Sequence, residues 1–124
     1  MMAGEGITVC ASADLPEGGQ GVRFPLTAAG EDATGFVVRH QGVVHGYLNR
    51  CLHLSLELDQ GSGRFFDSSG HFLMCAKHGA IYTPDTGRCA GGPCSGGRLR
   101  AIHVEEKDGW VVWHPDEFMR PARA

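Results

Sequence analysis

The sequence has no long apolar run and no excess of basic charge, and each absence excludes a class of protein. No segment reaches the roughly 18 consecutive apolar residues of a membrane-spanning helix, so no membrane association is expected. The net charge is −3 and the pI is about 6.1. Nucleic-acid-binding domains present a basic face, so no nucleic-acid partner is expected. The first residues lack the basic and apolar segments of a secretory signal, which predicts a cytoplasmic protein.

A chain of 124 residues has room for one domain, because a second independent core would need more chain. Aromatic residues make up only 8%, and the one helix candidate, residues 54–58, is too short to be stable alone. By contrast, 19 glycines and 6 prolines indicate many tight turns. The odd number of cysteines, five, favours thiols, metal ligands or small buried residues over a disulfide framework. The composition predicts a mainly β domain.

Strands are expected toward both ends of the chain. Runs rich in apolar and β-branched residues predict strands at residues 7–11, 22–26, 36–40, 43–48, 99–104 and 110–113. Two pairs of these runs are separated by short turns that contain glycine, Gln41-Gly42 and Asp108-Gly109. Such turns predict two hairpins, one in each half of the chain.

The other segments are expected to be less regular. Residues 27–35 are small and polar, which favours a loop, and the polar tail, residues 115–124, is expected to fray at its end. Residues 49–99 are interrupted by many glycines and allow only short strands. Trp110 and Trp113 belong to the last predicted strand, and both are expected to pack in the interior.

The middle segment carries two short pairs of metal-binding residue types. "NRCLH" supplies Cys51 and His53, and "CAKHG" supplies Cys75 and His78, with Cys75 placed 22 residues after His53. A single cysteine or histidine is more often a buried or hydrogen-bonded residue. Four of them in the order C-x-H and C-x2-H, within 28 residues, favour one common metal site.

Two kinds of metal site compete for this pattern. A zinc ion can bind two thiolates and two imidazoles, but the usual zinc spacings place the two cysteines together and then the two histidines. Here each short pair holds one cysteine and one histidine. Mixed pairs suit a binuclear iron–sulfur cluster, because one iron binds both thiolates and the other binds both imidazoles. The order favours iron–sulfur, and a zinc-binding interaction module stays open as an alternative.

The same residues resemble the Rieske-type [2Fe–2S] proteins. Their pattern is C-x-H, a spacer, C-x2-H-G, an aromatic residue and a Gly-Pro loop, and this chain follows it over about residues 35–113. The resemblance implies that Cys51 and Cys75 bind the inner iron of one [2Fe–2S] cluster. It implies that His53 and His78 bind the outer iron. The expected surroundings of the cluster are Leu52, Leu54, Lys77, Gly79, Ala80, Tyr82, Gly92 and Pro93.

The resemblance also implies a fold. It predicts one all-β domain over residues 1–124, built from three small antiparallel sheets. A cluster-binding subdomain of about residues 49–99 would be inserted in a base domain. That base would consist of about residues 7–48 and 99–114, so strands from both ends of the chain would support the cluster from below.

Two departures narrow the resemblance to its soluble ferredoxin branch. Rieske proteins of cytochrome complexes have a pair of disulfide-forming cysteines where this chain has Leu56 and Lys77, so that bridge cannot form. Their serine after H-G is Ala80 here, which removes one hydroxyl donor to cluster sulfur.

Cys89 and Cys94 lie five residues apart beside the Gly-Pro loop and are interpreted as small packed residues or as a reversible disulfide.

By resemblance, the expected function is a soluble carrier of single electrons. It would pass electrons from a flavin-dependent reductase to a terminal oxygenase or another acceptor protein. Rieske oxygenases add a much larger domain with a mononuclear iron site, so this chain is not expected to be an enzyme on its own. Three alternatives stay open: a small subunit of a reductase complex such as that of nitrite reduction, a redox sensor based on Cys89 and Cys94, and the zinc module.

Overall fold

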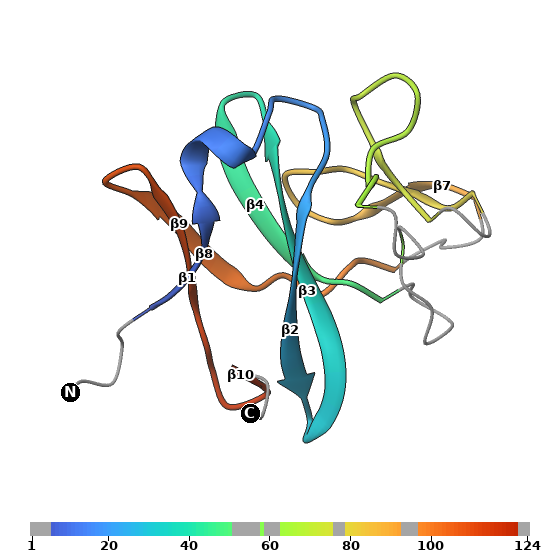
Figure 1. Ribbon diagram of the computed structural model, residues 1–124. Helices are drawn as coiled ribbons and strands as arrows, with labels where there is room; N and C mark the ends of the chain where they lie inside the picture. The colour runs from blue at the N-terminus through green and yellow to red at the C-terminus, as the bar shows by residue number, and fades with distance from the viewer. Residues whose placement is uncertain (1–5, 51–57, 59–62, 76–78, 93–96, 122–124) are drawn as a thin grey trace.

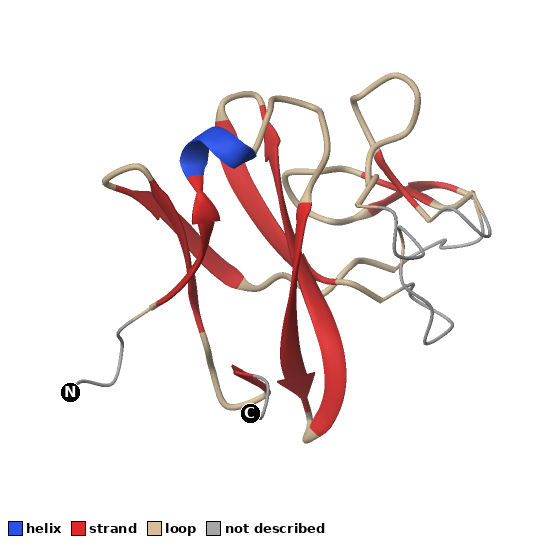
Figure 2. Cartoon of the chain, in the orientation of Figure 1, coloured by secondary structure: helices blue, strands red, loops and turns tan. Residues whose placement is uncertain are grey.

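The computed structural model describes residues 6–50, 58, 63–75, 79–92 and 97–121. Within these residues ten strands form three antiparallel sheets, and the only helical element is the 3-10 turn η1, Ser12–Asp14 (Figures 1 and 2). This architecture confirms the predicted all-β fold of three small sheets. No helix among the described residues is long and apolar enough to cross a membrane.

Two of the sheets form the base. The first has the order β1-β9-β8 and the second has the order β10-β2-β3-β4. The strands of the first sheet are β1 Ile7–Ala11, β8 His103–Lys107 and β9 Trp110–His114. Those of the second are β2 Val22–Ala28, β3 Glu31–His40, β4 Val43–Leu48 and β10 Met119–Pro121. The first and the last strand, β1 and β10, thus both belong to the base (Figure 1).

The third sheet belongs to residues 49–99, which we call the insert. It lies to the right in Figure 1 and has the order β5-β6-β7. Its strands are short: β5 Leu73–Met74, β6 Ile81–Tyr82 and β7 Cys89–Gly91. The insert leaves and rejoins the base at one neck, where the Leu48 amide donates to the Arg100 carbonyl at 2.9 Å. This bond brings the two ends of residues 49–99 together, and the subdomain boundaries stay a prediction.

The prediction of a loop at residues 27–35 is wrong. β2 and β3 pair from Val22↔Val37 to Ala28↔Glu31, and only Ala29 and Gly30 form the turn. Both turn residues have positive φ, 52° and 84°, which matches the twist that a two-residue hairpin turn needs. Small and polar side chains do not prevent pairing here because β2 and β3 satisfy each other's backbone groups.

The tail contains a strand at residues 119–121, and the fraying expected at its end falls on residues outside the described part. β10 pairs with β2 in the register Met119↔Ala28, and Met119 is 1% exposed. The Asp116 carboxylate accepts hydrogen bonds from the amides of Phe118 and Met119, which closes the turn before the strand. The base therefore continues beyond residue 114.

The two tryptophans of β9 differ, which corrects the expectation that both are packed. Trp113 is 2% exposed and belongs to the base core, whereas Trp110 is 51% exposed. Successive side chains of a strand point to opposite faces, so residues three positions apart cannot share one. Only the face of Trp113 is covered by the second sheet, through Phe24 at a ring distance of 5.2 Å.

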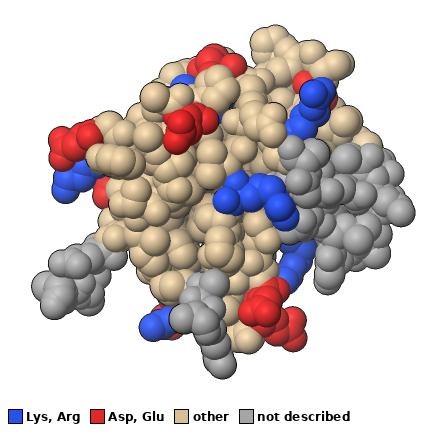
Figure 3. Space-filling view, in the orientation of Figure 1, with Lys and Arg blue, Asp and Glu red and all other residues tan. Residues whose placement is uncertain are grey.

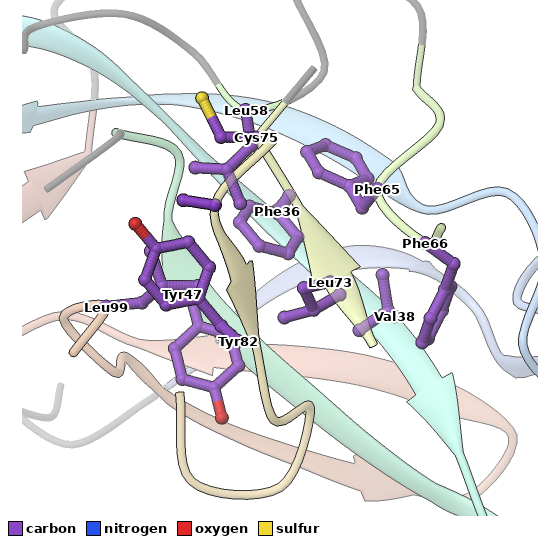
Figure 4. Packing of buried hydrophobic residues seen from close by; sticks show 11 residues of the cluster. Phe36, Val38, Tyr47, Leu58, Phe65, Phe66, Leu73, Cys75, Tyr82 and Leu99 are labelled. Carbon is purple, nitrogen blue, oxygen red and sulfur yellow. The ribbon is translucent and has the colours of Figure 1, made fainter. Parts of the chain in front are cut away.

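A hydrophobic core connects the base to the insert, and we call it the shared core. Strands β3 and β4 contribute side chains from the base, while the sheet and loops of the insert contribute the rest (Figure 4). Its buried members are Phe36, Val38, Tyr47, Leu58, Phe65, Phe66, Leu73, Cys75, Ala80, Tyr82 and Leu99. One of the expected metal ligands, Cys75, is thus part of the hydrophobic contact between the two parts.

Candidate metal centre

Cys75 follows β5 directly and is completely buried, with a free thiol. Its amide donates to the Ala80 carbonyl at 2.8 Å, and its carbonyl accepts from the Gly79 amide at 2.8 Å. These two bonds hold Cys75 against Gly79 and Ala80, and we call this contact the Cys75 turn. Figure 4 shows the Cys75 sulfur at one end of the shared core, pointing away from the ring of Phe36. The thiol is therefore held at the boundary between the core and the turn.

Two glycines shape the surroundings of this turn. Gly79 has φ +74°, a conformation that side-chain-bearing residues rarely adopt. Gly92 has φ +83°, and a Cβ atom there would lie 2.9 Å from Ala80 Cα and 3.0 Å from the Gly79 carbonyl oxygen. The backbone at Gly92 is thus pressed against the turn that follows Cys75. The structure brings the predicted residues Gly79, Ala80 and Gly92 together.

Ala80 and Tyr82 form the floor of the same region. They are 1% and 0% exposed, and Tyr82 pairs with Leu73 across the β5-β6 ladder. Because side chains alternate along a strand, Leu73 and Cys75 share one face with these two residues. The predicted residues Ala80 and Tyr82 therefore line the buried face that carries the Cys75 thiol.

An aromatic stack that the sequence alone did not predict supports this floor. The rings of Phe36 and Phe65 lie 4.0 Å apart and nearly parallel, at 7°, and the Tyr47 ring lies 6.0 Å from Phe36. The Tyr47 hydroxyl donates to the Pro84 carbonyl at 2.7 Å. Burial raises the pKa of Tyr47 to about 12, so this hydroxyl keeps its proton throughout the physiological range. The stack joins β3 and β4 to the insert on both sides of the site.

Asn49 is a second residue that the pattern did not single out. It is 4% exposed, its amide donates to the Thr34 carbonyl at 2.7 Å, and its side-chain oxygen accepts from the Leu58 amide at 2.8 Å. Asn49 thus connects the two ends of residues 49–58, the segment that contains the predicted ligands Cys51 and His53. A buried polar side chain needs hydrogen-bond partners. The position of an asparagine directly before "RCLH" was the only feature of the sequence that could have indicated this role.

Several predicted site residues lie outside the described part of the chain. They are Cys51, Leu52, His53, Leu54, Lys77, His78 and Pro93. Within the described residues, no group of three or more potential ligands is found. The complete ligand set therefore remains a prediction. What the structure shows of it is a buried free thiol at a strand end, enclosed by two glycine-containing segments.

The chemistry of this described part fits a thiolate-bound cluster. A fully buried cysteine at a turn, with glycine backbone pressed against that turn, leaves a sulfur to bind iron. Cys10, the other free cysteine among the described residues, differs from Cys75. Burial, followed by the nearby Asp14, raises the pKa of the Cys10 thiol, which keeps it protonated within β1. Cys10 therefore has a packing role in the base.

Cys89 is bonded in a disulfide, contrary to the favoured interpretation of a small packed thiol. It lies on β7 opposite Tyr82 and packs against the shared core. Its sulfur is 3.7 Å from the Gly91 carbonyl oxygen, a contact without a hydrogen because a disulfide sulfur carries none. Cys10 and Cys75 are free, so the partner of Cys89 lies outside the described residues.

The chain matches the family model of the Rieske [2Fe–2S] domain over residues 5–113, and it belongs to that family. Members hold a [2Fe–2S] cluster, so one such cluster is the cofactor of this chain and the zinc alternative is wrong. The buried Cys75 and its glycine turn agree with this cofactor. A comparison with curated proteins found no significant match.

Solved structures with this fold include ferredoxins of dioxygenase systems. The ferredoxin of carbazole 1,9a-dioxygenase from Nocardioides aromaticivorans IC177 is 23% identical, with a TM-score of 0.69, and the match covers 90% of this chain and 98% of that one. The ferredoxin of Sphingomonas yanoikuyae B1 is 22% identical, with a TM-score of 0.68 and coverage of 90% and 100%. A chain in the complex of reduced oxygenase and oxidized ferredoxin of carbazole 1,9a-dioxygenase is 27% identical, with a TM-score of 0.67 and coverage of 88% and 92%.

The fold also matches part of a larger chain. In the complex of carbazole-bound oxygenase and ferredoxin, this chain covers 28% of the matched chain, at 21% identity and a TM-score of 0.69. The matched ferredoxins, by contrast, are covered almost completely. The match thus spans nearly the whole length of these ferredoxins but only part of the larger chain.

Proposed function

We propose that this chain carries single electrons from a flavin-dependent reductase to a terminal oxygenase. The observation that supports this proposal most directly is the near-complete coverage of ferredoxin chains, together with the 27% identity to a chain in an oxygenase–ferredoxin complex. A carrier of this kind needs a rigid cluster site close to the surface and no substrate pocket. The turn after Cys75, supported by the shared core, supplies the rigid part of such a site.

We further propose that Cys51, His53, Cys75 and His78 hold the cluster. A bound Rieske cluster accepts and returns one electron, at potentials of about −150 to +300 mV. Cys75 would hold the iron nearer the core, because its thiol belongs to the shared core. His53 and His78 would present their imidazoles toward the partner. Leu52 and Leu54 would then form an apolar rim for short-lived contacts with partner proteins.

Electron paramagnetic resonance of the dithionite-reduced protein tests the cofactor and its ligands. We expect the signal of a [2Fe–2S] cluster with two histidine ligands. His53→Cys and His78→Cys should lower the reduction potential in variants that keep the cluster, because a thiolate adds negative charge at the iron. An unchanged potential in an intact cluster would show that these imidazoles are not ligands.

Reconstitution with partners tests the role. A ferredoxin reductase with NADH should reduce the cluster, and the reduced protein should support turnover by a Rieske oxygenase. The isolated chain should form no product from an aromatic substrate and dioxygen. Product formation without an oxygenase would contradict the carrier role. The proposed cytoplasmic location can be checked separately by fractionation of the cells that make the protein.

A further inference from the structure

One buried polar side chain lies directly before the proposed ligands Cys51 and His53. Charged side chains are spread over the face of the molecule drawn in Figure 3. The buried side chains of the described residues, by contrast, are hydrophobic with two exceptions, Thr27 and Asn49. Thr27 donates its hydroxyl to the Arg120 carbonyl at 3.3 Å and joins two strands of the base. Asn49 lies in the insert, at the start of residues 49–58, which we call the first ligand segment.

The backbone around Asn49 is fixed by the base. Directly after β4, the Asn49 amide donates to the Thr34 carbonyl of β3 at 2.7 Å. The next amide, that of Arg50, donates back to the Leu48 carbonyl at 2.9 Å, which makes a three-residue turn. The Cα atom of Cys51 lies within about 8 Å of that of Asn49, because consecutive Cα atoms are 3.8 Å apart. The first ligand segment therefore begins at a point anchored to a long strand.

The side chain of Asn49 holds the far end of the same segment. Its Oδ1 accepts from the Leu58 amide at 2.8 Å, a buried bond between residues nine positions apart. Leu58 is fully buried in the shared core, so packing fixes this end as well. The two ends of the first ligand segment thus meet at one side-chain oxygen. Closing a loop in advance removes conformational freedom that the binding of iron would otherwise have to remove.

The Cys75 turn is closed in a different way. Its two hydrogen bonds, from Cys75 to Ala80 and from Gly79 to Cys75, join backbone groups only. Almost any residue type supplies such groups, whereas the closure at Asn49 requires a side chain that accepts a hydrogen bond. An apolar residue at position 49 would leave the buried Leu58 amide without this acceptor. The closure of the first ligand segment is therefore specified by the identity of one residue.

We propose that Asn49 is a positioning residue of the metal centre: its bond to the Leu58 amide keeps Cys51 and His53 in the arrangement that binds the cluster. This inference rests on the proposed ligand set. Residues that orient metal ligands without touching the metal typically change metal affinity about 10- to 100-fold when they are replaced. Loss of the bond should loosen the segment and admit water to the cluster. Reduction adds one negative charge, which water stabilises, so the reduction potential should rise.

Asn49→Ala and Thr27→Val form a matched pair, because each removes the polar group of a buried side chain. In the holoprotein, Asn49→Ala should bleach about 10-fold faster than the parent, measured by visible absorbance. Its potential, measured by voltammetry, should be higher. Hydrogen exchange of the peptide that contains Leu58, measured by mass spectrometry, should be faster. Thr27→Val removes a bond within the base, so it should leave all three quantities as in the parent.

Asn49→Asp is the conservative variant, because a carboxylate keeps an oxygen that accepts from the Leu58 amide. Its bleaching rate and the exchange of the Leu58 peptide should stay much closer to the parent than those of Asn49→Ala. A cluster that assembles in Asn49→Asp and not in Asn49→Ala would support the inference. Loss of the cluster in both variants, or equally fast bleaching of both, would show that the acceptor oxygen does not position the ligands and would overturn it.

The outcomes separate this inference from the proposed function. A parent potential and bleaching rate in Asn49→Ala would overturn the positioning role and leave the carrier function standing. Equal changes in Thr27→Val and Asn49→Ala would show that overall stability governs the cluster, and would overturn the positioning role too. A parent protein without the paramagnetic resonance signal of a histidine-bound [2Fe–2S] cluster would contradict the ligand set, and this inference with it.

Discussion

Strand β3 of the base is ten residues long. It pairs with β2 over residues 31–37 and with β4 over residues 35–40, whereas β5 and β6 of the insert are two residues long. The base has cores of its own, with Trp113, Leu26 and Met119 in one and Val37, Val44 and Val111 in another. The described residues of the insert contribute only to the shared core, which also contains Phe36, Val38 and Tyr47 of the base.

This difference shows how a metal centre can be supported by little regular structure. Short two-stranded ladders are barely stable alone in water. The insert therefore depends on its contact with β3 and β4 and, by the proposed ligand set, on bonds to the cofactor. Changes in the insert should accordingly alter the cluster, and changes in the base should alter the stability of the scaffold. Each prediction below tests one part of this contrast.

Loss of the thiol at Cys75 should have the largest effect. Cys75→Ser should abolish cluster assembly and unfold much of the insert, because the cluster stabilises that part of the chain. Iron and sulfide analysis and the visible spectrum measure the first effect, and amide hydrogen exchange measures the second. Slow exchange should persist in the base strands. Cys10→Ser is the control and should keep the cluster, since Cys10 is packed in β1 of the base.

Removal of the aromatic stack should weaken the contact between the base and the insert. Phe65 is fully buried against Phe36, and Phe65→Ala should lower the free energy of unfolding by about 3–5 kcal/mol. Val43 is 54% exposed at the start of β4, so Val43→Ala should cost less than about 0.5 kcal/mol. Denaturant unfolding of both variants gives these values. A cost below 1 kcal/mol for Phe65→Ala would mean that the insert does not depend on this contact.

The disulfide of Cys89 should add a smaller increment to the insert. Elimination leaves Cys94 as its partner if Cys51 binds iron, because Cys10 and Cys75 are free. A bridge that closes so short a loop is worth about 2 kcal/mol at most. Dithiothreitol should reduce it to two thiols while dithiothreitol becomes its cyclic disulfide. Alkylation and peptide mass spectrometry before and after reduction identify the pair. Alkylation of Cys94 before reduction would disprove it.

Alanine substitutions at Gly92 and Gly42 separate the effect of backbone strain from that of a steric clash. Both have positive φ, 83° and 78°, so alanine is strained by about 1–2 kcal/mol at either position. At Gly92 the new methyl group also meets the turn after Cys75, whereas at Gly42 it meets nothing within 4 Å. Gly92→Ala should therefore speed bleaching of the cluster, measured by its visible absorbance, and Gly42→Ala should not. Equal bleaching rates would show that the Gly92 segment does not enclose the site.

A change of pH should affect the base through Glu106. The Arg39 guanidinium donates to both carboxylate oxygens of Glu106 and lowers the pKa of this residue to about 2 in the folded state. A carboxylate with a lowered pKa stabilises the fold above its unfolded pKa near 4.5, and this contribution is lost as the pH falls toward 2. The parent should therefore lose more stability than Glu106→Gln between these values, in acid titrations followed by circular dichroism. Parallel curves would contradict a role for the pair.

The sequence alone was sufficient for the features that depend on neighbouring residues. The turns at Gln41-Gly42 and Asp108-Gly109 formed as predicted, each with two consecutive positive φ angles. The C-x-H and C-x2-H pairs led to the Rieske family, which the family model confirms. These signals are local, because a two-residue turn or a ligand pair is specified by residues within a few positions of each other.

Only the tertiary structure decided the features that depend on distant pairing. β10 forms because Met119 pairs with Ala28 of β2. Most of residues 27–35 form strands because β2 and β3 satisfy each other's backbone hydrogen bonds. Trp110 stays exposed because no sheet covers its face of β9, although its neighbours in sequence are apolar. Phe65 stacks on Phe36, 29 positions earlier in the chain. Burial is a property of what lies opposite a side chain in space, and no local pattern specifies that.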